Sequence, residues 1–460
     1  MRSVLKFGGT SIKDAGMFQK VASIVAGHPG ERAIVVSAMT GVTNELVEIT
    51  SGRLNEIEVE ERLKGLRDMH GAVVASLPTA SIRDDVQRQL DARFDKLERL
   101  CKGVAILGDM TPRVRDLIHS YGERLSVVLL TGALRERGVN AVGMESDMIG
   151  MITDGVFGAA SPRLDEIERI FTSTLVPQMK GGAVPVITGF FGVDARGNAT
   201  TFGRGGSDFS AAIVAYALDA DACEIWTDVD GFMTADPRIV SGARVISEMN
   251  FNESAELAYF GARVLHPRTI EPARRKRIPI LVKNTFRPVG AGTRVCDATN
   301  GGGEKRLVGS VASKGSLAIV KIFSSEMAYQ PEFVSKVLGP LARNGVNAYA
   351  VSTSLATFSI LTDASNVALC QETLSGLEGV PIEKVVVRDG VSLICVVGER
   401  MAEHGVAARI FTTVAETGTS LIMISEGASD VAINFVVGGE READVVRAIH
   451  RQYVENGGGA

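Results

Sequence analysis

Short apolar runs alternate with amphipathic stretches along residues 1–296. Most of the stretches between the runs have a helical pattern. An alternation of strands and helices predicts an open, largely parallel sheet with helices on both faces. Five apolar runs, each bounded by glycine, proline or charge, are predicted to be its buried strands: SVLKF (3–7), RAIVVSAM (32–39), AVPVITGF (183–190), ACEIWTDV (222–229) and IPILVKN (278–284).

Residues 55–137 interrupt this alternation. The segment is charged and rich in arginine, glutamate and leucine, and it contains no run of strand type. We predict that it forms several helices packed as a lobe beside the sheet, within an α/β domain that spans residues 1–296.

The sequence pattern changes after residues 297–306, DATNGGGEKR, where three consecutive glycines predict a linker. Residues 307–460 contain an internal repeat, the first copy at about 314–376 and the second at about 385–455. Each copy has the order strand, helix, strand, strand, helix. This order predicts two stacked ferredoxin-like βαββαβ modules, whose role is binding or assembly because they lack catalytic-looking groups.

Composition narrows the class of protein. A chain of 460 residues is expected to form two or three domains, and 45% apolar with 22% charged residues is typical of a soluble globular protein. A net charge of −5 gives no reason to expect nucleic acid or an anionic membrane as a partner. The N-terminus is not of signal-peptide type and no apolar run is long enough to span a membrane, so a cytoplasmic protein is expected.

The five cysteines are far apart and form no C-x-x-C pair, which predicts buried free thiols in a reducing compartment. The six histidines are also scattered, so a histidine-rich metal site is not expected.

Two glycine-rich turns carry the first chemical signal. Lys6-Phe-Gly-Gly-Thr-Ser11 follows a strand and places a cation beside glycines and hydroxyls. In the second turn, GRGGSD (203–208), Ser207 is predicted to be the N-cap of the helix that follows. Backbone N–H groups at such turns bind phosphate oxygens. If both turns lie at the carboxyl ends of parallel strands, they face one crevice, where open α/β sheets bind ligands.

Two further stretches fit the same crevice. WTDVDGFMTADPR (226–238) places a hydroxyl, carboxylates and an arginine at a strand end, which suits a nucleotide, and SAMTGVTN (37–44) offers hydroxyls to a carboxylate. Each stretch alone could be an ordinary connecting loop. The four together predict a ligand site.

These stretches closely resemble the aspartokinases, members of the amino-acid kinase family, and the tandem repeat resembles the paired ACT regulatory modules of that family. The resemblance implies an amino-acid-kinase-like sheet followed by two ACT modules. Essentially the whole chain takes part, through KFGGTS (6–11), VVSAMTGVTN (35–44), GERLSVVLL (122–130), VITGFFG (186–192), TTFGRGGSD (200–208), EIWTDVDGFMTADPR (224–238), ELAYFGARVLHP (256–267) and KNTFRP (283–288).

The resemblance implies ATP-dependent phosphorylation of the β-carboxylate of L-aspartate to 4-phospho-L-aspartate. It makes Lys6 and Asp208 the catalytic pair: Lys6 neutralises the transferring phosphate, and Asp208 positions Lys6 and the attacking group. Arg204 would bind the α-carboxylate through its planar fork, and Glu123 the ammonium group. Hydroxyls of Ser37, Thr43 and Ser207 would complete the substrate site.

ATP is the implied co-substrate, with Mg²⁺ bridging its phosphates. No protein nucleophile is required, because the substrate carboxylate attacks the γ-phosphorus and is ionised well below neutral pH. Two positions depart from the family pattern: Arg263 replaces a lysine, and Met233 stands where an aromatic residue is expected. The full implied set of ATP contacts is Lys6, Gly8, Gly9, Thr10, Ser11, Thr227, Asp228, Met233, Arg238, Arg263 and Val264.

The repeats depart further. The first has no glycine where the ACT ligand loop usually enters its helix, and the second has GASD (427–430) where G-x-SE is more usual. The effector is therefore left open between lysine, threonine and none. Pairing of ACT sheets between protomers predicts a homodimer, with a tetramer as the alternative. The effector residues expected in the first module are Met327, Tyr329, Gln330 and Phe333.

Two alternatives remain. A kinase of the same fold could act on glutamate or acetylglutamate, although the substrate residues and the paired modules favour aspartate. A catalytically inactive amino-acid sensor is the other alternative, and retention of Lys6, Asp208 and Asp228 argues against it. The chain length leads us to expect no fused homoserine dehydrogenase. The downstream pathway, whether to lysine, threonine, methionine or ectoine, is left open.

Overall fold

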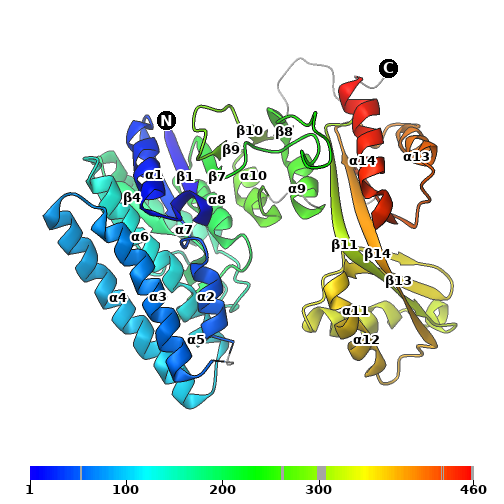
Figure 1. Cartoon of the computed structure of the whole chain (residues 1–460), viewed down its shortest axis with the longest axis horizontal. Helices are drawn as coiled ribbons and strands as arrows, with labels where there is room; N and C mark the ends of the chain where they lie inside the picture. The colour runs from blue at the N-terminus through cyan, green and yellow to red at the C-terminus, as the bar shows by residue number, and fades with distance from the viewer. Residues whose placement is uncertain (52–53, 261–263, 298–306, 426, 428, 457–460) are drawn as a thin grey trace. The chain divides into compact units, whose positions relative to one another are not determined.

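The computed structural model describes all residues except 52–53, 261–263, 298–306, 426, 428 and 457–460. The chain forms two compact units (Figure 1). The first consists of Met1–Phe232, Ser247–Phe251 and Val264–Thr299, and the second of Met233–Ile246, Asn252–Arg263 and Asn300–Ala460. The second unit thus takes in two segments from the range 1–296, for which the sequence predicts the α/β domain, and most of the predicted linker lies outside the described residues.

An eight-stranded sheet forms the centre of the first unit, in the order β3-β4-β2-β1-β7-β9-β10-β8. Every neighbouring pair is parallel except β9 and β10. The predicted parallel-rich α/β fold is confirmed, and the five predicted strands correspond to β1, β2, β4, β7 and β9. The strands span Arg2–Phe7 (β1), Glu31–Val36 (β2), Ala141–Met144 (β3), Val184–Thr188 (β4), Ala222–Thr227 (β7), Glu248–Asn250 (β8), Ile280–Asn284 (β9) and Thr293–Cys296 (β10).

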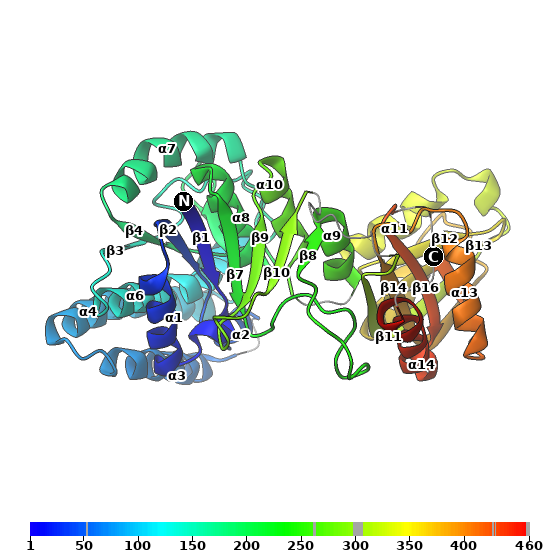
Figure 2. The same cartoon turned by 90° about the horizontal axis from the view of Figure 1, so that it is seen from above.

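Helices cover both faces of this sheet, as Figure 2 shows from above. Helices α1 (Ala15–Gly27) and α6 (Tyr121–Arg135) pack together on one face. The opposite face carries α7 (Leu164–Lys180), α8 (Gly206–Leu218) and α10 (Ile270–Arg275), with α8 in the middle against β1 and β7. The central position of α8 explains its composition, since nearly all its residues are buried.

Residues 55–137 form helices, as their composition predicts. Asn55 and Glu58 make a capping box at the start of α3 (Glu56–Ala75), and Thr111 caps α5 (Pro112–His119), which has proline in its first turn. Helix α4 spans Ala80–Leu107 and the shorter α2 spans Val42–Ile49. One continuous apolar core joins these helices to α6 and the sheet, so the lobe is fixed to the body of the first unit.

The second unit contains a six-stranded antiparallel sheet in the order β12-β13-β11-β14-β16-β15. Two strands of 14 residues, β11 (Ser310–Phe323) and β14 (Lys384–Val397), run side by side through its centre (Figure 1). The other elements are α11 (Phe333–Arg343), β12 (Ala350–Thr353), β13 (Thr357–Asp363), α12 (Val367–Ser375), α13 (Val406–Glu416), β15 (Met423–Ser425), β16 (Ala432–Gly438) and α14 (Glu442–His450).

Both repeats have the predicted ferredoxin-like fold, but they share their long strands. The first module uses the second half of β11 and the first half of β14, which pair at Ile319–Arg388 and beyond. The second module begins with the second half of β14, and its fourth strand is the first half of β11, which precedes the first module in the chain. Two separate cores form, one under α11 and α12 and one under α13 and α14.

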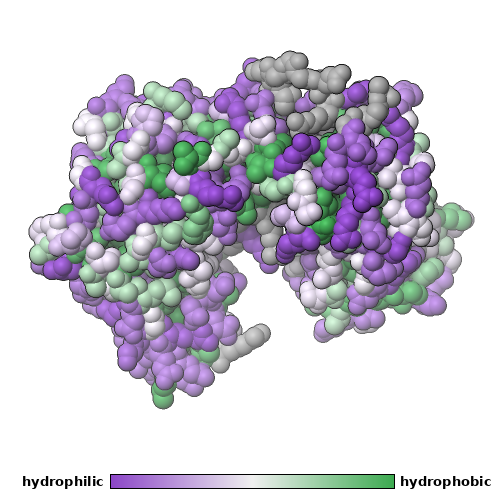
Figure 3. All heavy atoms as spheres, turned by 45° about the horizontal axis from the view of Figure 1, so that its top comes forward, coloured by the Kyte–Doolittle hydropathy of each residue, from purple (hydrophilic) through white to green (hydrophobic). Residues whose placement is uncertain are grey.

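All five cysteines are free thiols, as predicted, and four of them are buried. Within the described part of the chain, no helix is both long and apolar enough to cross a membrane. On the face drawn in Figure 3, hydrophilic residues are spread over both units and apolar residues occur in small separate groups, as on ordinary protein surfaces.

Candidate active site

A cleft of about 970 Å³ lies at the carboxyl ends of β1, β2 and β7 in the first unit. Its walls come from the turns that follow these strands, from α5 and α6, and from the turn that enters α8. The crevice expected from the glycine turns therefore exists. Of the residues predicted for the site, it brings together Lys6, Gly8, Gly9, Thr10, Ser37, Thr43, Glu123, Arg204, Ser207, Asp208, Thr227 and Asp228.

Lys6 and Asp208 form an ion pair in this cleft. The Nζ atom of Lys6, near the end of β1, lies 2.6 Å from Oδ1 of Asp208 in the first turn of α8. Lys6 is only 8% exposed. Gly8 leaves room for its ammonium group, because a Cβ there would lie 3.1 Å from Nζ. A Cβ on Gly9 would lie 3.0 Å from the carbonyl oxygen of Ala38, so close packing favours glycine at both positions.

The start of α8 differs from the prediction. The N-cap is Gly205, not Ser207, and its left-handed φ of 67° lets the helix begin two residues earlier. Ser207 lies inside the first turn, where its Oγ is 3.5 Å from Oε1 of Glu123. A Cβ on Gly205 would lie 2.2 Å from Cβ of His266, so close packing also requires glycine at this cap.

Glu123 is a buried carboxylate in the first turn of α6, 3% exposed. Its Oε1 accepts a hydrogen bond from the backbone N–H of Ala38 at 3.0 Å, whereas Oε2 has no hydrogen-bond partner among the described residues. Burial raises the pKa of Glu123 to about 8, against which the bonds from Ala38 and Ser207 act only partly. A cation bound beside this group would favour its ionised form.

Arg204 projects at the exposed side of the cleft, in the turn between β6 (Ala199–Thr201) and α8. Among the described residues it has no hydrogen-bond or ion-pair partner. A guanidinium that no protein carboxylate neutralises is available to an anionic ligand.

Other predicted residues support the site from outside the cleft or are placed elsewhere. Ser11 is buried under the first turn, where its hydroxyl bonds Thr285 Oγ1 at 2.7 Å. Met233 and Arg238 belong to the second unit, and Arg238 pairs there with Asp236. Val264 lies in the first unit. Arg263 lies outside the described residues.

Three of the expected effector residues lie between β11 and α11, and the fourth, Phe333, is the first residue of α11. Met327 and Tyr329 form a short 3-10 helix, in which the Tyr329 side chain is 79% exposed, and Gln330 follows it. Phe333 is fully buried in the core of the first module. Met327 packs against that core from its edge, Gln330 is half-buried, and Tyr329 is the most accessible of the four to a ligand.

The cleft residues that escape the sequence analysis include three titratable ones, Arg115, Asp116 and His119, all on α5. His119 Nε2 lies 2.8 Å from Oγ1 of Thr50, and burial lowers the pKa of His119 to about 4. Their segment, TPRVRDLIHS, has the pattern of an ordinary amphipathic helix. Only the fold brings it beside the glycine turns.

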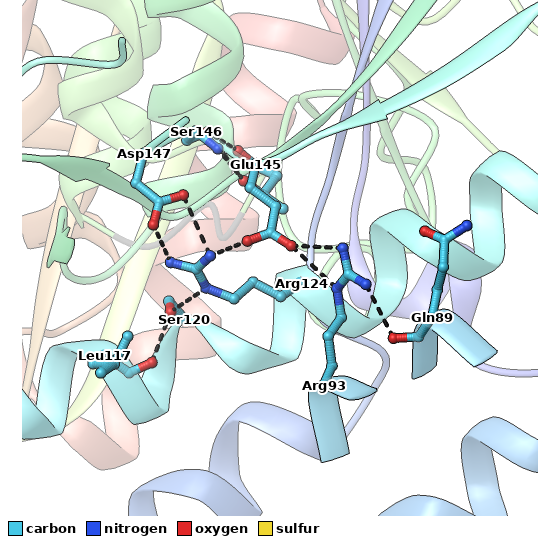
Figure 4. A network of polar contacts seen from close by, with 9 residues as sticks. Gln89, Arg93, Leu117, Ser120, Arg124, Glu145, Ser146 and Asp147 are labelled. Atoms are coloured by element: carbon cyan, nitrogen blue, oxygen red, sulfur yellow. Dashed lines mark hydrogen bonds and ion pairs between the residues drawn. The ribbon is translucent and has the colours of Figure 1, made fainter. Parts of the chain in front are cut away.

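A polar network fixes the helix that carries Glu123 (Figure 4). Arg124, the next residue of α6, pairs with Glu145 and, at 2.5 Å, with Asp147, both in the loop after β3. Arg93 of α4 contacts the same Glu145 at 2.7 Å. The network joins α6 to the loop after β3 and to the helical lobe, so the part of α6 that carries Glu123 is held in place.

An open, largely parallel sheet with two glycine turns and a lysine–aspartate pair at the carboxyl ends of its strands is typical of α/β enzymes that bind phosphate groups. A family model described as the amino acid kinase family matches residues 1–284, and one described as an ACT domain matches residues 394–453.

Similar proteins narrow the class of enzyme further. Lysine-sensitive aspartokinase 3 of Escherichia coli is 33% identical over 98% of this chain and 99% of its own, and aspartokinase 2, chloroplastic, of Arabidopsis thaliana is 33% identical over 98% and 84%. The crystal structure of E. coli aspartokinase III in complex with lysine and aspartate matches with a TM-score of 0.85 and 32% identity, over 98% of this chain and 99% of that one.

The chain therefore belongs to the amino acid kinase family and, within it, to the aspartokinases. It is an aspartate kinase with ACT modules of the kind through which such enzymes are regulated allosterically.

Proposed function

We propose that this aspartate kinase transfers the γ-phosphoryl group of ATP to the β-carboxylate of L-aspartate and releases 4-phospho-L-aspartate. One observation carries the proposal: a single cleft holds an unpaired guanidinium, a buried carboxylate with one free oxygen, and a lysine–aspartate pair, all among the described residues. Those groups match the α-carboxylate, the ammonium group and the reacting end of aspartate in charge and number. The E. coli relative in complex with aspartate supports the same substrate.

Substrate recognition is assigned by charge. Arg204 binds the α-carboxylate in a bidentate fashion, since its fork has no competing partner among the described residues. Glu123 binds the ammonium group through Oε2, the oxygen without a hydrogen bond in the described part of the chain. The hydroxyls of Ser37, Thr43 and Ser207 line the same cleft and hold the substrate between these two ends.

Phosphoryl transfer is assigned to positioning and charge neutralisation. The Lys6 ammonium neutralises charge on the transferring phosphoryl group, and Asp208 holds it in place. The β-carboxylate is already ionised at neutral pH, so no general base is required. The wider set of ATP contacts remains as the sequence suggests it. Gly8, Gly9, Thr10, Thr227 and Asp228 line the cleft, Ser11 and Val264 lie elsewhere in the first unit, Met233 and Arg238 belong to the second unit, and Arg263 is outside the described residues.

Mg²⁺ fits this arrangement as a partner of the ATP phosphates. The described residues contain no group of three or more His, Cys, Asp or Glu side chains placed to hold a metal by themselves. Mg²⁺ usually binds through one or two carboxylates together with substrate phosphates, and Asp228 at the end of β7 is the carboxylate available for it. When bound, the ion neutralises phosphate charge and fixes the geometry of ATP.

Regulation and assembly complete the proposal. Lysine is the first effector to test, because two E. coli matches carry lysine in their names, and threonine is the second. Binding is assigned to the partly exposed segment with Met327, Tyr329 and Gln330. We further propose a cytoplasmic homodimer formed through the ACT sheets. The product would supply synthesis of lysine, threonine and methionine, or of ectoine.

The test is trapping of the acyl phosphate as a hydroxamate, with ATP and Mg²⁺ and with L-aspartate, L-glutamate or N-acetylglutamate. The proposal predicts hydroxamate with L-aspartate only, and a lower rate when lysine is added. Product with N-acetylglutamate or glutamate instead would reassign the substrate. Absence of product with all three would contradict phosphoryl transfer.

A further inference from the structure

Asp116 is a buried acid that the proposed chemistry does not use. It lies on α5 at the wall of the cleft and is 2% exposed. Its Oδ2 accepts two backbone hydrogen bonds, from the N–H of Gly158 at 2.8 Å and from the N–H of Thr201 at 2.7 Å. One carboxylate oxygen therefore joins two chain segments that are far apart in the sequence.

Arg268 joins the same two segments through hydrogen bonds to their carbonyl oxygens. Its Nη1 donates to the carbonyl oxygen of Phe202 at 2.7 Å, and its Nη2 donates to the carbonyl oxygen of Ala160 at 2.7 Å. The guanidinium also lies over the ring of Phe209, with Cζ 4.6 Å from the ring centroid. The planar fork suits this double donation, which a lysine cannot reproduce.

The two segments meet directly as well. The N–H of Ala160 donates to the carbonyl oxygen of Thr201 at 2.9 Å. A Cβ on Gly203, whose φ is +78°, would lie 2.9 Å from the carbonyl oxygen of Gly158. Segment 158–160 therefore forms a base for segment 201–203, and Arg204 is the next residue after it.

Arg204 itself has no hydrogen bond that fixes its direction among the described residues. Its position must then come from the backbone on either side, which is the α8 cap at Gly205 and segment 201–203. Asp116 accepts one N–H bond from segment 158–160 and one from segment 201–203, and Arg268 donates to one carbonyl group of each segment. The two segments are thus held together by charge-assisted bonds to both their N–H and their carbonyl groups.

We propose that Asp116 and Arg268 are positioning residues for the substrate, which fix the backbone before Arg204 and thereby set the affinity for the α-carboxylate of aspartate. The inference rests on the proposed function, because Arg204 is the proposed α-carboxylate ligand. Neither residue needs to touch the substrate. We call Asp116 and Arg268 together the clamp. Displacement of a binding group by about 1 Å is enough to lower activity about 100-fold, so loss of the clamp should have a measurable effect.

The experiment is steady-state kinetics on the full-length enzyme with five variants: Asp116→Ala, Asp116→Asn, Arg268→Ala, Arg268→Lys and Arg204→Ala. Asp116→Asn keeps an oxygen that can accept both N–H bonds, so we expect a KM for aspartate close to wild type. Asp116→Ala and both Arg268 variants should raise the KM for aspartate by roughly tenfold or more, with the KM for ATP unchanged. Matched controls are Asp109→Ala and Arg196→Ala. Both residues are exposed, and in the sequence Asp109 is near Asp116 and Arg196 is near Arg204.

A double-mutant comparison separates positioning from general destabilisation. In the Arg204→Ala background, Asp116→Ala should produce no further rise in the KM for aspartate, because the group that it positions is gone. A full additional rise would overturn the clamp, as would equal losses for ATP and aspartate in a variant that melts at the wild-type temperature. If Arg204→Ala alone leaves the KM for aspartate unchanged, the assignment of Arg204 fails and the clamp fails with it. Selective loss in Arg204→Ala without loss in Asp116→Ala would reject the clamp alone.

Discussion

The ammonium group of Lys6 lies 2.6 Å from the carboxylate of Asp208, where strand β1 and helix α8 meet the cleft. A carboxylate beside a phosphate-binding turn is unfavourable by itself, because it repels the ligand. Pairing with Lys6 offsets that repulsion and restrains a flexible side chain that, in the proposed mechanism, contacts the transferring group. The aspartate in the second glycine turn is thereby explained as a support for the lysine in the first.

Replacement of Asp208 by asparagine should free the Lys6 side chain while leaving α8 intact. We expect kcat to fall by about 10–100-fold, since one electrostatic contact to the transition state becomes poorly oriented. The KM for aspartate should change little. Steady-state kinetics measure both values, and Asp219→Asn at the exposed other end of α8 is the matched control. A fall in aspartate affinity with kcat unchanged would move Asp208 from catalysis to substrate binding.

Arg204 provides a second test, because its replacement should change the KM for aspartate and not the KM for ATP. Arg204→Ala should raise the KM for aspartate by roughly 30-fold or more, because a charge-assisted bidentate pair contributes about 2 kcal/mol or more. The KM for ATP should stay near the wild-type value. Arg204→Lys should recover only part of the loss, since an ammonium group lacks the fork. Equal losses for both substrates would exclude the assigned contact.

Glu123 makes the account sensitive to pH. Burial raises its pKa to about 8 from an ordinary value of 4.5, so the free enzyme holds a proton there at neutral pH. The ammonium group of aspartate needs the ionised form. The KM for aspartate should therefore fall as the pH rises from 6 to 8 and level off above 8. In Glu123→Gln the KM should be high and nearly flat over this range.

The raised pKa of Glu123 also makes the stability of the folded protein depend on pH. Between pH 4.5 and about 8 the unfolded chain ionises Glu123 while the folded protein keeps it protonated, so stability is lost as the pH rises through this window. Glu123→Gln, which cannot ionise, should melt at a higher temperature than wild type at pH 9, and the difference should shrink towards pH 5. Thermal unfolding at pH 5, 7 and 9 measures this, and a constant difference would contradict the raised pKa.

Gly205 tests the geometry of the α8 cap. Gly205→Ala should lower the unfolding free energy by more than about 2 kcal/mol, because left-handed strain is added to a clash with His266 at 2.2 Å. Gly138 is the control: its φ is +72° and nothing lies within 4 Å of an added Cβ. Gly138→Ala should cost only the backbone strain, about 1–2 kcal/mol. Similar losses for the two variants, in denaturant titrations, would show that the clash is relieved.

Much of the architecture could be predicted because its signals are local. Buried parallel strands are continuous apolar runs, and five of them identify the sheet. The glycine turns also have a local cause, since glycine is needed where backbone approaches a ligand. These local features are sufficient to predict that Lys6, Arg204 and Asp208 share one crevice, and all three line the cleft.

The missed features depend on tertiary contacts. Strands β11 and β14 belong to both modules, but a repeat in the sequence does not reveal that a strand of one copy completes the sheet of the other. Asp116 has no motif, and only the fold brings two N–H groups to it. Ser207 has the residue type of a cap, yet Gly205 adopts the left-handed conformation and begins the helix earlier.

The most direct test of the central claim is the rate of phosphoryl transfer in a single turnover of Lys6→Ala, at saturating ATP, Mg²⁺ and aspartate. Saturation removes effects on binding, so the rate reports the chemical step alone. The account predicts a fall of about 100–1,000-fold relative to wild type, with the fold and the melting temperature kept. Lys13→Ala, which removes an exposed lysine close to the same turn, should be unaffected. A near-normal rate in Lys6→Ala would contradict the account, because the lysine–aspartate pair would then have no part in the reaction.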